Sequence, residues 1–107
     1  MTQAEARLKL EEFRVKIDDV DRRIVALLNE RTTVVQDIGR VKREAQLPIY
    51  EPKREDQVFA NITGCNCGPI SPEAVRRIFE RIIDEMRTIQ KARMLTTEAA
   101  GSPEGEK

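Results

Sequence analysis

A charged residue, Arg31, occupies a position where the surrounding sequence pattern calls for an apolar side chain. It lies between Leu27 and Val34 in a row of apolar residues that are spaced alternately by three and four. Burying an unpaired guanidinium costs several kcal/mol. Arg31 therefore requires either a buried carboxylate, such as Asp21 or Glu30 of a partner chain, or an anionic ligand in a cavity. Its own position favours neither.

A second cation, Lys42, favours the anionic ligand. It follows Arg31 by eleven residues, close to three helical turns, so both side chains project from nearly one face of a helix. Their Cα atoms would be roughly 16 Å apart by the helical rise. Two long cationic side chains that reach toward each other from this separation can hold a small dianion between them. Lys42 alone would be read as a solvated charge.

Three further polar residues have ambiguous positions. Gln90 continues an apolar row one turn after Met86, where it either faces water at a helix end or donates a hydrogen bond inside the same cavity. Arg54 shares a face with Val58 at a spacing of four and is expected to lean inward. Its neighbour Glu55 has no such signal. Surface capping charges are the simpler interpretation of Arg54 and Glu55 from the residues alone.

The composition excludes several kinds of chemistry. The chain of 107 residues contains no His, so it has no Ser-His-Asp or Cys-His nucleophile pair and no His proton shuttle. Its two cysteines, Cys65 and Cys67, are too few for a closed structural zinc site without His. We therefore expect no structural zinc site within one chain.

The charge balance restricts the partners. The 19 Lys and Arg residues are balanced by 19 Asp and Glu residues, so the formal net charge is zero. A general binder of nucleic acid or anionic membranes carries a basic excess. No apolar run approaches the roughly 20 residues of a membrane span. Two Cys form no disulfide framework, which favours free thiols in the cytoplasm. The sequence therefore predicts neither a nucleic-acid nor a membrane partner.

Periodicity and Pro/Gly punctuation predict an all-α fold with three helices and no strand. Residues 1–94 form the predicted domain, and the polar residues 95–107 are expected to be a disordered C-terminal tail. The predicted elements are a long helix over residues 4–45, a short helix that begins at Pro52 and ends before Gly64, and a medium helix with Ser71 as its N-cap that runs to about Met94.

The long helix predicts a dimer. At 1.5 Å per residue it would extend roughly 60 Å, whereas a domain of this size has a radius of gyration of about 13 Å. Its apolar row is nearly continuous, and the other two helices are too short to cover it. An intertwined homodimer with antiparallel long helices would bury the whole row. The alternative, a helix that breaks near Arg31 or Gly39 and folds back, lacks a Pro or turn cluster to support it.

Together these positions resemble the all-helical chorismate mutases, the AroQ class. The resemblance covers residues 10–90, most of the chain. The stretch Tyr50–Glu55 also resembles mutase domains fused to, or partnered with, the first enzyme of the shikimate pathway, which implies a synthase as a partner. The matching positions are Arg14 with Ile17, Asp21, residues 24–31, residues 39–42, residues 48–55, and residues 77–83 down to Gln90.

The resemblance implies an intertwined helical dimer with two equivalent sites that convert chorismate to prephenate, in phenylalanine and tyrosine biosynthesis. By this resemblance Arg31 binds one substrate carboxylate and Arg14, from the partner chain, binds the other. Arg14 and Arg31 are seventeen positions apart, which corresponds to roughly 25 Å of helix, so an antiparallel partner can bring the two arginines to one ligand more easily than a single chain can. Lys42 and Gln90 would hydrogen-bond the ether oxygen of the breaking bond.

The same resemblance assigns the remaining site residues. Arg54 would support a carboxylate or order the site, and Glu55, with the region of Glu51, would hold the ring hydroxyl. Met86 departs from members that carry a Ser there, because a thioether cannot donate a hydrogen bond to a substrate carboxylate. The reaction is unimolecular and pericyclic, so it requires no nucleophile, base, metal or redox cofactor.

Three other functions compete with this one. Isochorismate pyruvate lyase uses the same scaffold and a related anion, but the retained Arg54-Glu55 pair favours the mutase. A weakly active regulatory or dimerisation module of a shikimate-pathway enzyme is compatible with the same sequence. A coiled-coil scaffold is a weaker alternative, since it would not explain Arg31 and Lys42 on the apolar side.

Overall fold

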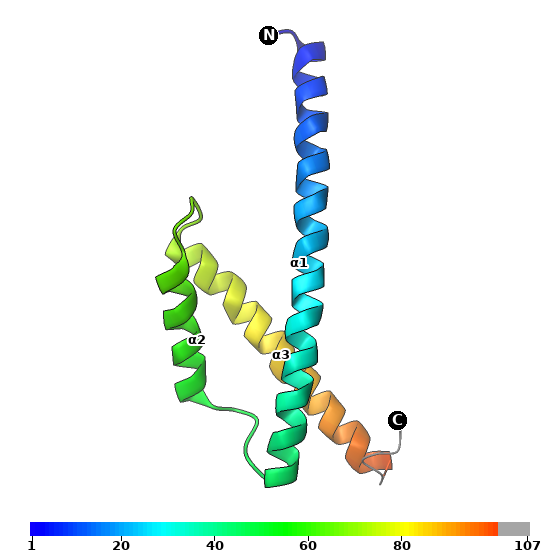
Figure 1. The fold of residues 1–107 in the computed structure, drawn as a ribbon, viewed down its shortest axis with the longest axis vertical. Coiled ribbons are helices and arrows are strands. Elements are labelled where there is room, and N and C mark those ends of the chain that lie inside the picture. Colours follow the sequence, from blue (N-terminus) through cyan, green and yellow to red (C-terminus); the bar gives the residue numbers. More distant parts are fainter. Residues whose placement is uncertain (101–107) are drawn as a thin grey trace. The chain divides into compact units, whose positions relative to one another are not determined.

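The computed structural model describes residues 1–100, with side chains through residue 92. Its backbone forms three helices, α1 (Gln3–Ala45), α2 (Pro52–Cys65) and α3 (Pro72–Ala100), and no strand within residues 1–100 (Figure 1). The predicted all-α class and helix order are confirmed. The third helix continues to Ala100, past the expected end near Met94, and residues 101–107 of the predicted tail lie outside the described residues.

Both ends of α1 are fixed by local hydrogen bonds. At its start the Glu5 backbone N–H donates to Thr2 Oγ1 (3.1 Å) and the Thr2 backbone N donates to Glu5 Oε1 (2.7 Å), a reciprocal capping box. At its end Leu47 N donates to Lys42 O (2.7 Å) and Gln46 N donates to Arg43 O (3.2 Å). This second pair is a Schellman motif, which turns the chain away from the helix axis.

Gln46 adopts the left-handed conformation that this motif requires, with φ 59°. That conformation costs an L-residue roughly 1–2 kcal/mol, whereas Gly adopts it without the clash at Cβ. We expect Gln46→Gly to raise the free energy of unfolding by about 0.5–1 kcal/mol, because the relief exceeds the extra entropy of an unfolded glycine. Urea denaturation of both proteins measures this, and a less stable Gln46→Gly protein would contradict it.

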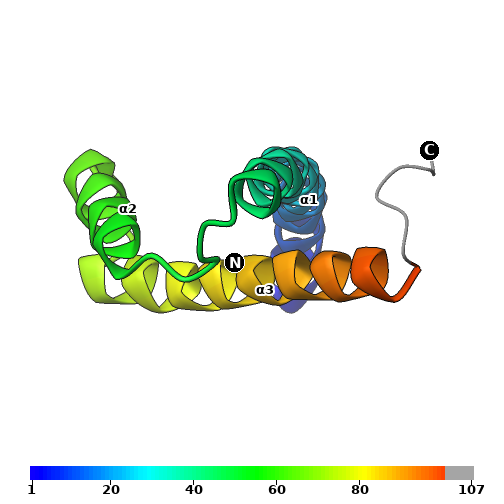
Figure 2. The ribbon, with the colours of Figure 1, turned by 90° about the horizontal axis from the view of Figure 1, so that it is seen from below.

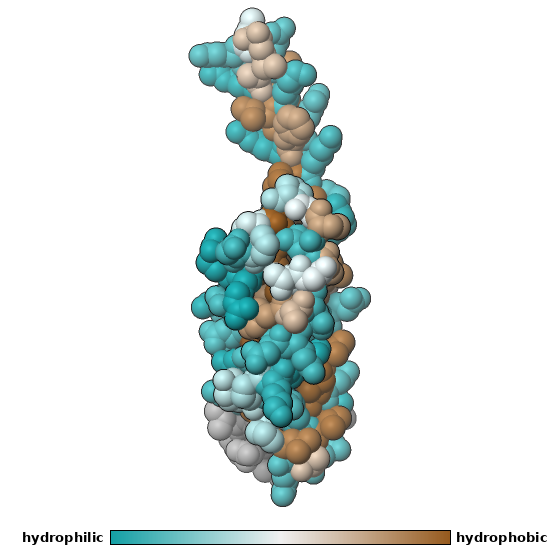
Figure 3. Space-filling view, turned by 90° about the vertical axis from the view of Figure 1, so that its left-hand side faces the viewer, coloured by the Kyte–Doolittle hydropathy of each residue, from teal (hydrophilic) through white to brown (hydrophobic). Residues whose placement is uncertain are grey.

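The chain divides into two units, residues 1–34 and residues 35–107. The first is the amino-terminal part of α1, a single helix with an exposed row of large apolar side chains that is visible at the top of Figure 3. Such a row has no core of its own to enter. Its members include Leu10, Phe13, Ile17, Val20, Ile24 and Leu27.

The second unit contains the most deeply buried side chains among the described residues, Met86 and Gln90. In it α2 packs beside α3, and residues 35–45 of α1 cross α3 (Figure 2). Ser71 caps α3 as predicted, because its Oγ accepts a hydrogen bond from Ala74 N (3.1 Å). Within residues 1–100, no helix combines the length and the apolar character that crossing a membrane requires.

Candidate functional site

The turn after α1 brings the chain back onto Lys42. Lys42 Nζ donates to Ile49 O (3.0 Å) and pairs with Glu51 Oε1 (2.8 Å), and its side chain is only 12% exposed. An ammonium group has three N–H donors. These contacts use two of them, and a third is available to a ligand as far as residues 1–92 are concerned. The Schellman turn thus converts a lysine at a helix end into a fixed, mostly buried cation.

Gln90 lies on α3 against the same stretch of α1. It is 8% exposed, and its Nε2 donates to Val35 O (3.1 Å). Its Cγ would lie 3.5 Å from a Cβ added at Gly39, three residues before Lys42. Residues three apart are neighbours on a helix surface. Gln90 therefore lies against the turn of α1 that carries Lys42. Met86, one turn before Gln90 on α3, is a buried apolar residue with 7% exposure.

The space between Gly39 and Gln90 has room for a Cβ at Gly39 but not for a long side chain. Gly39→Ala adds only an ordinary van der Waals contact, so we expect it to raise the free energy of unfolding by up to about 1 kcal/mol through helix propensity. Gly39→Leu overfills the space and should lower it by about 1–3 kcal/mol. Urea denaturation measures both changes. Equal effects of Ala and Leu would contradict this close packing of Gln90.

Glu55 pairs with Arg87, a residue to which the sequence pattern assigned no role. Arg87 Nη2 donates to Glu55 Oε2 (2.5 Å), which joins α3 to α2. This hydrogen bond raises the pKa of Arg87 above the usual arginine value, and desolvation by burial opposes the rise. A sequence signal did exist: Arg87 continues the steps of four from Phe79 and Ile83, so a guanidinium lies on an apolar row.

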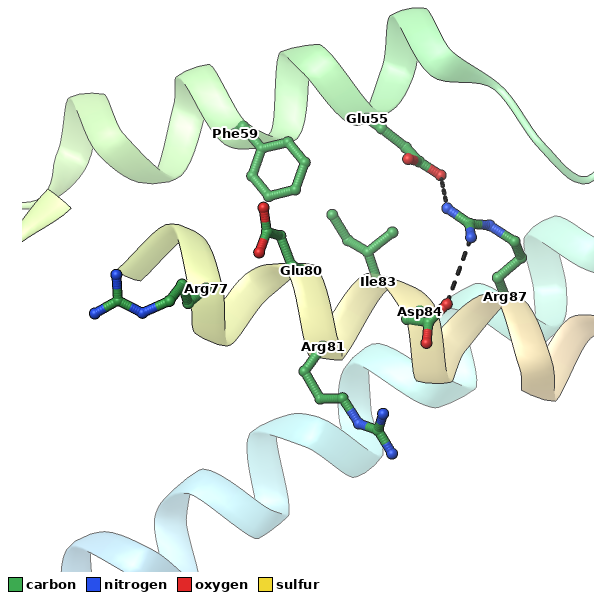
Figure 4. A pocket seen from close by; sticks show the side chains of 8 residues that line it. All are labelled: Glu55, Phe59, Arg77, Glu80, Arg81, Ile83, Asp84 and Arg87. Carbon is green, nitrogen blue, oxygen red and sulfur yellow. Dashed lines mark hydrogen bonds and ion pairs between the residues drawn. The ribbon is translucent and has the colours of Figure 1, made fainter. Parts of the chain in front are cut away.

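The Arg87–Glu55 pair closes one end of a shallow pocket between α2 and α3 (Figure 4). Three arginines and three carboxylates line it, so its charges balance. It therefore lacks the cationic excess that a dianion requires. The lining residues are Glu55, Phe59, Arg77, Glu80, Arg81, Ile83, Asp84 and Arg87.

Arg54 does not lean inward as predicted. Its side chain is exposed, and Nη1 donates to Gln57 Oε1 (3.3 Å) three residues on. The local contact satisfies the guanidinium on the helix surface. In the single chain the structure thus supports the surface interpretation of Arg54.

The predicted site residues fall into the two units. Arg14 is exposed and pairs with Glu11 at 3.7 Å, and Arg31 is partly buried; both lie in the first unit. The residues in the second unit are Lys42, Glu51, Arg54, Glu55, Met86 and Gln90. Cys65 and Cys67 are exposed free thiols at the end of α2 and just beyond it.

Comparison with known proteins links this geometry to one enzyme family. The chain is 31% identical over 84 residues to the chorismate mutase of Methanocaldococcus jannaschii, covering 78% of this chain and 85% of that protein. It is 38% identical over 87 residues to a bifunctional chorismate mutase/prephenate dehydratase of Aquifex aeolicus, covering 78% of this chain. The match spans only about a quarter (24%) of the length of that relative.

The fold comparison agrees with the sequence comparison. The structure of chorismate mutase (form II) from Thermus thermophilus superposes with a TM-score of 0.76 at 37% identity, covering 78% of this chain and 94% of that one. The family model of chorismate mutase type II matches residues 13–91, which include every predicted site residue. The chain therefore belongs to the chorismate mutase type II family.

Proposed function

We propose that this chain catalyses the pericyclic rearrangement of chorismate to prephenate. The observation that carries the proposal is a pair of largely buried donors. Lys42 lies near the end of α1, and Gln90 of α3 packs against Gly39, one turn before Lys42. In this reaction an ether C–O bond breaks while a C–C bond forms in the same molecule. Negative charge develops on the ether oxygen, and an ammonium and an amide N–H directed at it stabilise the transition state.

The site can also accelerate the reaction by restraining the conformation of the bound substrate. The transition state is a compact chair, whereas the free substrate is extended, so cations that match the chair favour reaction over mere binding. We assign one substrate carboxylate to Arg31 and the other to Arg14 of a partner chain, with Arg54 as support. Glu55 and Glu51 hold the ring hydroxyl.

An intertwined antiparallel homodimer completes the proposal. The amino-terminal part of α1 carries an exposed apolar row, including Phe13, Ile17 and Leu27, and a second copy of the chain would cover it. Arg14, exposed on the same part of the helix, would then enter the partner's site. Met86 is buried and has no hydroxyl, so the carboxylate contact made by Ser in other members is either lost, which weakens substrate binding, or supplied by water or another residue.

The relatives suggest the setting of the reaction. The Aquifex aeolicus relative joins a chorismate mutase to a prephenate dehydratase. We therefore place this chain in aromatic amino acid biosynthesis. The resemblance of residues 50–55 to mutase domains that work with the first enzyme of the shikimate pathway supports a synthase as a further partner. Two exposed free thiols fit the reducing conditions of the cytoplasm.

Loss of chorismate absorbance with the purified chain tests the activity. We expect prephenate as the product, formed about 10⁶-fold faster than without enzyme, at the lower end of common enzymatic accelerations. Acid treatment converts prephenate to phenylpyruvate, which identifies it. Salicylate and pyruvate from isochorismate would instead establish a lyase. An inactive chain that gains mutase activity only with a shikimate-pathway synthase would indicate a regulatory module.

A further inference from the structure

Arg87 is held from three directions by groups close to the proposed site. Its Nη2 contacts Glu55 Oε2 of α2 (2.5 Å), its Nη1 lies 3.5 Å from Asp84 Oδ1, and its guanidinium carbon lies 5.1 Å from the centre of the Tyr50 ring. Tyr50 belongs to the segment that follows α1. Arg87 therefore joins α2, α3 and the segment between α1 and α2 at one point.

The Arg87–Glu55 pair differs from the surface ion pairs of this chain in its burial. The two side chains are 27% and 24% exposed, whereas Arg81 and Glu85, one turn apart on α3, are 74% and 50% exposed. Arg87 Nε is buried and has no hydrogen-bond partner among the described residues. A partly desolvated pair is screened less by water and salt than an exposed one, so Arg87 restrains the Glu55 carboxylate more strongly.

The segment that contacts Arg87 is also the one that contacts Lys42. Ile49 O and Glu51 Oε1 bind Lys42 Nζ, and the ring of Tyr50, which lies between these two residues in sequence, faces Arg87. The Arg87–Glu55 pair is thus connected through three consecutive residues to the proposed catalytic lysine.

We propose that Arg87 is a positioning residue, which holds the Glu55 carboxylate in place to accept a hydrogen bond from the ring hydroxyl of the substrate. This inference rests on the proposed function. Arg87 contacts Oε2 of Glu55, and an ionised carboxylate offers about four acceptor positions on its two oxygens. Oε1 can therefore accept the hydroxyl while Oε2 stays bound to Arg87. Arg87 itself does not touch the substrate.

A positioning role predicts an effect that depends on the substrate hydroxyl. We would measure kcat/KM of the wild type, Arg87→Met, Glu55→Gln and the double variant with chorismate and with an analogue that lacks the ring hydroxyl. Each single variant should lose about tenfold with chorismate, as expected for a hydrogen bond to a charged group. The double variant should lose no more than either single one, and the analogue should distinguish none of the four proteins. Arg87→Lys, which keeps the charge, should recover part of the loss.

Arg81→Met is the matched control, because Arg81 forms an exposed pair on the same helix. It should leave kcat/KM unchanged with both substrates. Urea denaturation of each variant shows whether it is folded under assay conditions. If Arg87→Met is unfolded, Arg87→Lys takes its place in the comparison. Multiplying losses in the double variant, or equal losses with and without the hydroxyl, would overturn the positioning role. A wild type that makes no prephenate would instead refute the proposed function itself.

Discussion

Mixing an Arg14→Ala chain with an Arg31→Ala chain is expected to restore about a quarter of wild-type activity, although each variant alone is nearly inactive. Removing one partner of a hydrogen-bonded charge pair costs about 2–5 kcal/mol, so each variant alone should lose about 30-fold to several thousand-fold in kcat/KM. Random reassociation makes about half of the dimers hybrids. If Arg14 acts in the partner's site, each hybrid has one complete site and one site that lacks both arginines.

A second mixture supplies the control. Equal amounts of wild type and an Arg14→Ala/Arg31→Ala double variant should give about a quarter of the activity of an all-wild-type sample, because hybrids then contain no complete site. If both arginines acted within one chain, the same mixture would retain about half. Affinity tags of two kinds confirm that hybrids have formed. Hybrids that regain no activity in the first mixture would refute the shared site, and a monomeric mass in solution would refute the dimer.

The helices could be predicted because their signals are local. The apolar period of residues 4–45 and the Ser71 N-cap act within a few residues, and the structure has α1 over Gln3–Ala45 and Ser71 bonded to Ala74 N. The end of α3 differs from the prediction of about Met94. The composition after Met94 has no apolar row that would extend the helical pattern, yet the helix continues to Ala100.

The parts that the sequence did not predict depend on contacts between distant residues or on an unusual backbone conformation. Glu55 and Arg87 are 32 residues apart, and their pairing requires α2 to pack on α3. The turn at Gln46 uses a left-handed residue that is not Gly, which hides the Schellman motif from pattern analysis. That turn places Ile49 O and Glu51 on Lys42, so the environment of this lysine was also beyond prediction.

The largest effect of a single substitution is expected at Lys42. Lys42→Met keeps most of the buried aliphatic length but removes the ammonium that we propose is directed at the developing negative charge on the ether oxygen. Removing one such donor typically lowers kcat by about 10²–10³-fold, which corresponds to roughly 3–4 kcal/mol of barrier. KM should change much less, because the ether oxygen bears little charge in the ground state.

Lys42 also holds Ile49 O and Glu51, so its structural contribution must be separated from its chemical one. Glu51→Gln removes the ion pair but keeps the ammonium, and it should lower kcat far less than Lys42→Met does. Lys53→Met, which alters an exposed lysine in the first turn of α2, should change neither constant. Steady-state kinetics with chorismate measures all three variants. If Lys42→Met raised KM at unchanged kcat, the lysine would bind the ground state and transition state equally, and the developing charge would require another donor.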